Sequence, residues 1–150
     1  MIEGFEGGDD LERTLSRLSA GVPAEKLAYL GKRQMEGLVE KEAKIIVPKR
    51  TRTLQRDITT QAVISDDGEV EIRTGTNTSY GPHVEYGTGR AGAESGVDPP
   101  PDYLYGPSAG RPAKPFLRPA WDNNKEDVIK GLIEDLGDAV DEAVQDGGGG

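Results

Sequence analysis

Several residue types on which protein function often depends are absent or scarce in this chain of 150 residues. It has no cysteine, which excludes a disulfide framework and a thiolate metal site. Its one histidine is His83, so a zinc site would need carboxylates almost alone, which zinc rarely uses. No apolar run approaches the roughly 20 residues needed to cross a bilayer, and the acidic, glycine-rich residues 1–10 are unlike a secretory signal peptide. The sequence therefore predicts a soluble protein without metal or other cofactor, assembled in the cytoplasm and not in a membrane.

Motifs that carry catalysis are also missing. His83 and Glu85 lie two residues apart on a predicted strand and would share one face, but no third partner accompanies them. The glycines of residues 87–90 are not followed by the Lys-Ser/Thr pair or the helix start of a phosphate-binding loop. We therefore predict no catalytic residue and no enzyme. A small enzyme remains a rival class, which dose-dependent activity on any substrate would favour.

The composition fits one domain with much irregular chain. Hydrophobic residues make up only 34% of the sequence, whereas glycine and proline number 21 and 10. A domain of this size buries roughly 70% of its extended surface, which is enough for a single core. We predict a flexible lead at 1–8, one domain at 9–146 with a loop insertion at 89–113, and a glycine tail at 147–150.

Apolar periodicity predicts helices at both ends of the chain. The first begins at Asp9 or Asp10 and ends at Gly21. The second begins at Pro23, whose missing N–H suits a first helical turn, and runs to about Ile46. After Trp121, a cap at Asp122 or Asn123 begins the last helix, whose wide apolar stripe includes Val128, Ile129, Leu132, Ile133, Leu136, Ala139 and Val140.

The middle of the chain changes to a period of two. Apolar residues alternate with polar ones over 57–75 on both sides of Ser65-Asp66-Asp67-Gly68, which predicts a β-hairpin. A third strand is expected over 80–86, at an edge because Pro82 has no N–H to donate. The predicted fold class is therefore α+β: a long N-terminal helix and a C-terminal helix packed on a small, mainly antiparallel β-sheet.

Residues 89–113 predict a long Gly/Pro-rich loop. Loops of this length are uncommon inside a compact domain and are usually functional or disordered. Tyr103, Leu104 and Tyr105 supply apolar anchors within it. Two interpretations stay open, namely a floppy insertion and a segment that becomes ordered against a neighbouring subunit.

Charge is distributed unevenly along the chain. The total is −9, which argues against a general nucleic-acid binder because such proteins usually carry a basic surface. Residues 44–56 are nevertheless rich in Lys and Arg, and residues 122–146 are rich in Asp and Glu. Three interpretations stay open: two solvated faces, a basic surface for DNA, or complementary surfaces that meet between subunits. For the last possibility the candidate charges are Arg50, Arg52, Arg56, Glu134, Asp135 and Asp138.

Two motifs follow each other along the chain. One is the run from Tyr80 to Thr88, and the other is the block from Pro115 to Ala120 that precedes the last helix. Together and in this order they resemble the neck proteins (head–tail connector or minor tail components) of long-tailed, lambdoid bacteriophages. The stretches 43–48 and 51–55 resemble the family's helix end and following turn, although Arg52 stands where the family usually has glycine and Gln55 where it usually has arginine. The residues that carry the resemblance are Tyr80, Val84, Glu85, Tyr86, Gly87, Thr88, Pro115, Phe116, Leu117, Arg118 and Pro119.

The resemblance implies a virion structural protein that joins the DNA-filled head to the tail as a ring of identical subunits. It implies a six-fold ring, with a twelve-fold ring as the alternative. The implied partners are the portal-side connector or head-closure proteins and the tail terminator or tail tube, and DNA would pass through the lumen without specific binding. The rival function is a DNA-binding accessory protein that uses residues 44–56.

The second motif has a physical interpretation of its own. Pro115 and Pro119 restrict the backbone around Phe116 and Leu117, which can then act as rigid apolar plugs in the core or at a subunit interface. Arg118 is placed to reach a carboxylate, for which Glu85 is the candidate.

Overall fold

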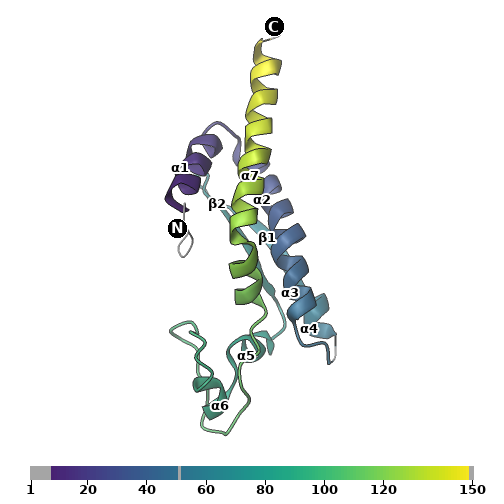
Figure 1. Cartoon of the computed structure of the whole chain (residues 1–150), viewed down its shortest axis with the longest axis vertical. Helices are drawn as coiled ribbons and strands as arrows, with labels where there is room; N and C mark the ends of the chain where they lie inside the picture. Colours follow the sequence, from purple (N-terminus) through teal and green to yellow (C-terminus); the bar gives the residue numbers. More distant parts are fainter. Residues whose placement is uncertain (1–7, 51, 149–150) are drawn as a thin grey trace.

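A computed structural model describes residues 8–50 and 52–148, and it has the predicted α+β class (Figure 1). Helix α1 spans Gly8–Ser19. The predicted second helix is continuous but has three parts, α2 (Ala24–Gln34), the π-helical segment η1 (Met35–Glu40) and α3 (Lys41–Ile46). Pro23 precedes it as expected, and the chain becomes extended at Val47, just before Pro48. The predicted flexible lead lies outside the described residues except for Gly8.

The predicted hairpin is confirmed. Strand β1 (Ile58–Ile64) pairs antiparallel with β2 (Val70–Thr76) in the register Ile58↔Thr76 to Ile64↔Val70. Gly68 has a φ of 85°, which glycine adopts without the penalty of a Cβ, and its N–H donates to the carbonyl of Ser65 at 3.0 Å. A short helix α4 (Thr53–Arg56) leads into β1.

The third strand is wrong, because residues Gly81–Tyr86 form helix α5. Pro82 occupies the first turn of that helix, where the missing N–H leaves no hydrogen bond unmade. The loop is also not structureless, since Gly89–Ala93 form helix α6. The sheet accordingly has two strands within the described residues.

The last helix is longer than predicted at both ends. Helix α7 spans Leu117–Gly148, so it begins before the expected caps and includes part of the expected glycine tail. Figure 1 shows α7 lying along α2 and α3 and then continuing beyond the other elements. Among the described residues no helix is both long and apolar enough to cross a bilayer.

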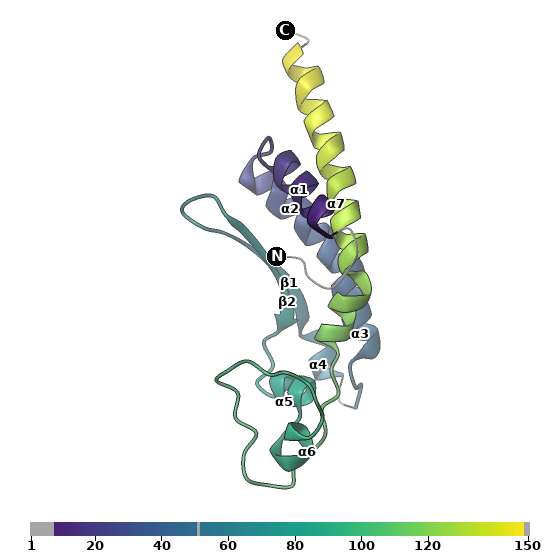
Figure 2. The same cartoon turned by 60° about the vertical axis from the view of Figure 1, so that its left-hand side comes forward.

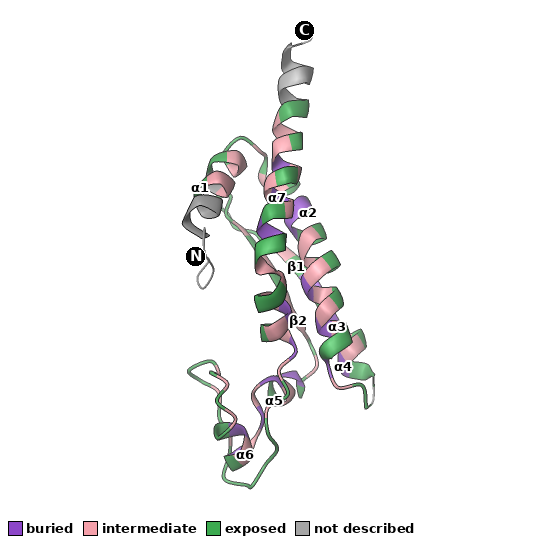
Figure 3. Cartoon of the chain, in the orientation of Figure 1, coloured by how far each residue is buried: buried purple, intermediate pink, exposed green. Residues whose placement is uncertain are grey.

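Two apolar clusters hold the helices together. The larger one joins α3, α4, β1 and the start of α7, and its buried members are Val39, Ala43, Val47, Leu54, Ile58, Phe116, Ala120 and Val128. The second lies further along α7 and contains Leu30, Leu132 and Leu136. Figure 3 shows the buried residues on the sides of α7 and the α2–α3 helix that face each other. This core fixes the start of α7 next to α5.

Candidate functional site

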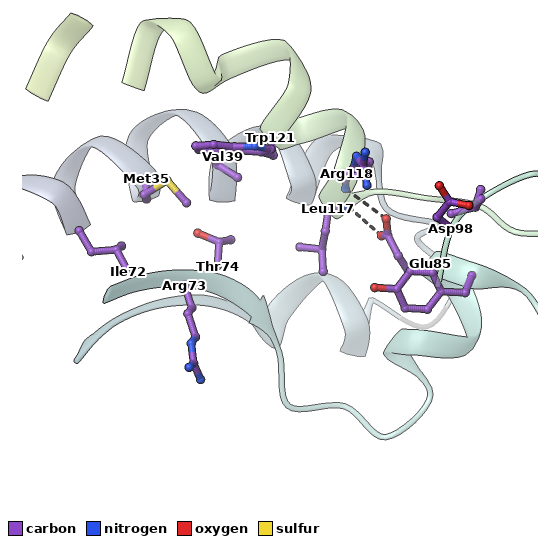
Figure 4. Close-up of a pocket in the computed structure, with 12 residues that line it drawn as sticks. Met35, Val39, Ile72, Arg73, Thr74, Glu85, Asp98, Leu117, Arg118 and Trp121 are labelled. Atoms are coloured by element: carbon purple, nitrogen blue, oxygen red, sulfur yellow. Dashed lines mark hydrogen bonds between the residues drawn. The ribbon is translucent and has the colours of Figure 1, made fainter. Parts of the chain in front are cut away.

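The two motifs of the resemblance meet at the carboxylate of Glu85. This side chain comes from α5 and is only 3% exposed. Its Oε1 accepts hydrogen bonds from the backbone N–H groups of Phe116 at 2.9 Å and Leu117 at 2.8 Å, and its Oε2 accepts one from the N–H of Arg118 at 3.1 Å. Figure 4 shows the carboxylate pointing at the first turn of α7. We call this arrangement the Glu85 clamp.

The clamp provides hydrogen-bond acceptors for the N–H groups at the start of α7. The first N–H groups of a helix have no partner within the helix, and the N-terminal end carries a partial positive charge. Glu85 accepts from three successive N–H groups, and Pro119, the next residue, has no N–H that would need a partner. A buried carboxylate that is hydrogen-bonded in this way escapes most of the cost of losing water. Glu85 therefore caps α7 from a segment 31 residues earlier in the chain.

Phe116 and Arg118 have different roles from each other. Phe116 is fully buried in the larger apolar cluster, which confirms the core packing that was one of its two predicted roles. Arg118 contacts Glu85 as predicted, but through its backbone N–H. Its guanidinium Nε instead lies 3.5 Å from Asp122 Oδ2, one turn along α7. The expected side-chain bridge to Glu85 is wrong because the carboxylate is already occupied by the helix start.

A cavity of about 460 Å³ lies beside the clamp (Figure 4). Its apolar wall comes from η1, β2 and α7, with Met35, Val39, Ile72, Leu117 and Trp121, while Glu85, Tyr86, Asp98 and Arg118 lie at its polar end. Burial, and next the negative charge of Glu85, raise the pKa of Tyr86 above its ordinary value. The cavity can hold an apolar side chain, but it offers no nucleophile paired with a base.

The Gly87-Thr88-Gly89 part of the motif builds a backbone junction. Thr88 donates its N–H to the carbonyl of Arg111 at 2.9 Å and accepts the N–H of Arg111 at 3.1 Å. Gly87 has a φ of 80°, and a Cβ there would lie 2.6 Å from the Cα of Gly92 and 2.7 Å from the nitrogen of Ala113. Only glycine fits at position 87. The pairing of Thr88 with Arg111 ties both arms of the 89–113 segment to the clamp.

Tyrosines reinforce the junction. The ring of Tyr103 packs edge-on against Tyr86 and Tyr105, at centroid distances of 5.1 and 5.2 Å, and its hydroxyl donates to the carbonyl of Gly87. Burial, followed by the neighbouring Tyr105 and Tyr86, raises the pKa of Tyr103. Of the three predicted apolar anchors, Tyr103 and Tyr105 pack within the subunit, whereas Leu104 is exposed. Nothing in the sequence indicated that they would pack on the motif residue Tyr86.

The candidate intersubunit charges lie far apart on one subunit. Arg52 and Arg56 lie on either side of Leu54, which packs in the same cluster as Ala120 of α7. Glu134 lies fourteen residues beyond Ala120 on that helix, which is roughly 21 Å at the usual helical rise. Asp135 accepts a hydrogen bond from the Gln34 side chain at 2.9 Å. Within the described residues, none of the three arginines forms an ion pair.

Arg52, which stands where the family usually has glycine, has a left-handed backbone conformation. Its φ is 59°, and it is the one non-glycine residue with positive φ in the described part of the chain. The turn therefore keeps a left-handed backbone even though an L side chain there costs free energy.

In the part of the chain that the structure describes, no group of three or more His, Asp or Glu side chains is placed to hold a metal ion. Comparison with known proteins found no matching family model, curated protein or solved structure.

Proposed function

We propose that this protein is a structural component of a bacteriophage virion, a neck protein that joins the head connector to the tail tube as a ring. The observation that carries the proposal is the Glu85 clamp. The two motifs of the resemblance are 31 residues apart at their bonded atoms, yet they form one unit in which each needs the other. The residues that carry the resemblance thus lie together in space, which supports the proposal.

The shape of the subunit supports assembly. A helical body and a loop-rich end lie at different heights along the molecule, and α7 continues past the body (Figure 2). Elongated subunits of this kind can pack side by side and still present both ends to other rings. Six copies are proposed, with twelve as the alternative, placed between head-closure or portal-side proteins and the tail terminator or tail tube. DNA passes through the lumen and is not held by specific contacts.

The mass of the assembled protein tests this proposal. Native mass spectrometry over a range of concentrations should show a closed species of six or twelve copies, with few intermediates. Electron microscopy of the same sample should show rings. A chain that remains monomeric or dimeric at every concentration contradicts the proposal.

A DNA-binding accessory protein is the second candidate, and one observation favours it. Residues 48–57 and 80–118 together contain eight Lys and Arg against five Asp and Glu, in a chain that is otherwise strongly acidic. Affinity for duplex DNA that falls steeply with salt would support this function. Reversing Arg50, Arg52 and Arg56 would then abolish binding.

A further inference from the structure

An exposed leucine stands out on the surface of the loop. Leu104 is 86% exposed, which is more than any other large hydrophobic residue in the described part of the chain. Its neighbours explain this orientation, because Tyr103 and Tyr105 on either side pack against each other, and the Tyr103 hydroxyl is bonded to Gly87. The braced tyrosines leave Leu104 pointing outward on a fixed support, with the exposed carboxylate of Asp102 close by in sequence.

A pocket of complementary chemistry lies on the other side of α5. It has a volume of about 340 Å³, and its apolar part is formed by Pro48, Leu54, Tyr80, Val84 and Pro112. Three cations, Arg50, Arg111 and Lys114, line the same pocket. Each of the three residues is exposed, and none forms an ion pair with another described residue. We call it the basic pocket.

Helix α5 separates the leucine from the pocket. Tyr86 of α5 packs on Tyr103, whereas Tyr80 and Val84 line the basic pocket, and His83 touches both regions. Figures 1 and 2 show the loop that follows α6 on one side of α5 and the α3–α4 turn on the other, at the same end of the molecule. Leu104 and the basic pocket therefore belong to the same end of the subunit, on segments at either side of α5.

We propose that Leu104 of one subunit inserts into the basic pocket of the next copy of this chain. The occupant is argued from charge and shape, since an apolar side chain with the exposed carboxylate of Asp102 two residues away meets an apolar pocket lined by three cations. Two different patches in contact make a head-to-tail joint, and such joints close into rings when the rotation allows. The inference rests on the proposed ring and names the joint that builds it.

Prearranged anchors favour this kind of joint. Leu104 loses little freedom on docking because its backbone is already held by the tyrosines and by the hydrogen bonds between residues 88–91 and 105–111. Burying a leucine contributes enough free energy to change an association constant by about 10- to 100-fold. Leu104→Ala should weaken each joint by about that factor and leave the melting temperature of the monomer unchanged.

Mixing two defective variants tests whether the joint is head-to-tail. Leu104→Asp has a damaged loop and an intact pocket, whereas the double variant Arg111→Glu, Lys114→Glu has an intact loop and a damaged pocket. Each variant alone should remain monomeric. A 1:1 mixture should give a heterodimer and nothing larger, because a pair of these variants has one competent joint. Unchanged ring formation by either variant overturns the inference.

Engineered thiols locate the joint directly, because the native chain has no cysteine. The double variant Leu104→Cys, Lys114→Cys, treated with a short bis-maleimide, should give a covalent ladder that stops at the ring size. The control pairs Leu104→Cys with Gln61→Cys, which lies exposed on the hairpin. If the ring forms normally but the cysteine pair gives no more cross-linked ladder than the control, the proposed joint is wrong and the proposed function still stands. Wild-type protein that shows no oligomer and no ladder at any concentration contradicts both.

Discussion

The helical body and the loop end of this protein are held together in different ways. By the helical body we mean α1 to α4, the hairpin, and Phe116 with α7, and by the loop end residues 80–115. In the body, buried apolar side chains such as Ala43 and Leu136 pack between helices. The loop end is held together instead by backbone hydrogen bonds, by close contacts at glycines that have no room for a Cβ, and by packed tyrosine rings.

The Glu85 clamp joins these two regions. The first turn of α7 belongs to the body through Phe116 and to the loop end through Glu85. The body is stabilised by side-chain packing and should tolerate conservative apolar substitutions. The junction is stabilised by close backbone contacts and should tolerate almost no substitution. The comparison therefore predicts which substitutions are most damaging and why.

Phe116→Ala should have the largest effect on folding. Truncating a fully buried phenylalanine leaves a cavity and costs about 3–5 kcal/mol of unfolding free energy, and Phe116 has 0% exposure. Urea unfolding monitored by circular dichroism measures the loss. The control is Val63→Ala, on a side chain that is 50% exposed. An unchanged midpoint for Phe116→Ala would show that the body is not organised around this ring.

Glu85→Gln should come next. The amide keeps the shape of the side chain but loses the negative charge and two of its good acceptor positions, so the free energy of unfolding should fall by about 2–3 kcal/mol. Glu94→Gln is the matched control, because Glu94 is exposed at the end of α6. Hydrogen exchange should show faster exchange at the amides of residues 116–118. Equal stability of both variants would mean that α7 does not depend on the clamp.

Arg52→Gly should stabilise the protein slightly. Relieving the left-handed strain raises the free energy of unfolding by about 1–2 kcal/mol. The greater freedom of glycine in the unfolded chain lowers it by about 0.5–1 kcal/mol. The same change at Arg50, whose φ is not positive, should only destabilise. Thermal unfolding of the two variants compares them. If both lower the melting temperature equally, the positive φ at Arg52 does not exist in solution.

Reversing Arg50, Arg52 and Arg56 together should affect assembly more than folding. An exposed ion pair contributes only about 0.2–1 kcal/mol, but a ring repeats it at every joint. Compensating reversal at Glu134, Asp135 and Asp138 restores assembly if those surfaces meet. Sedimentation velocity of the triple variant and of the compensated variant measures their assembly. Normal assembly of the triple variant would mean that the three arginines are solvated and form no joint.

Sequence reasoning succeeded where side chains decide the structure. The apolar periods of α2 and α7 and the turn at Ser65–Gly68 predicted the helices and the hairpin, and the isolated Phe116 was correctly expected to pack in the core as one of two roles. It failed at residues 81–86, because six residues with one proline carry no clear period. It also failed at the start of α7, whose cap comes from Glu85 and not from the local candidates Asp122 and Asn123.

The junction of the loop end could not be predicted for a related reason. Its contacts are between backbone atoms, as in the pairing of Thr88 with Arg111, and backbone atoms are the same in every residue. The glycines at 87, 89 and 110 indicated turns but not which segments would touch. Both motifs include the residues of the clamp, and Arg118 was expected to reach Glu85 through its side chain, but the sequence did not indicate that three backbone N–H groups would bind this carboxylate.

The copy number of the assembled wild-type protein tests the central claim most directly. Native mass spectrometry at increasing concentration measures it without any substitution. The account predicts a transition from monomer to a single closed species of six copies, or of twelve in the alternative. An open-ended series of sizes, or monomer at all concentrations, would contradict a ring-forming neck protein.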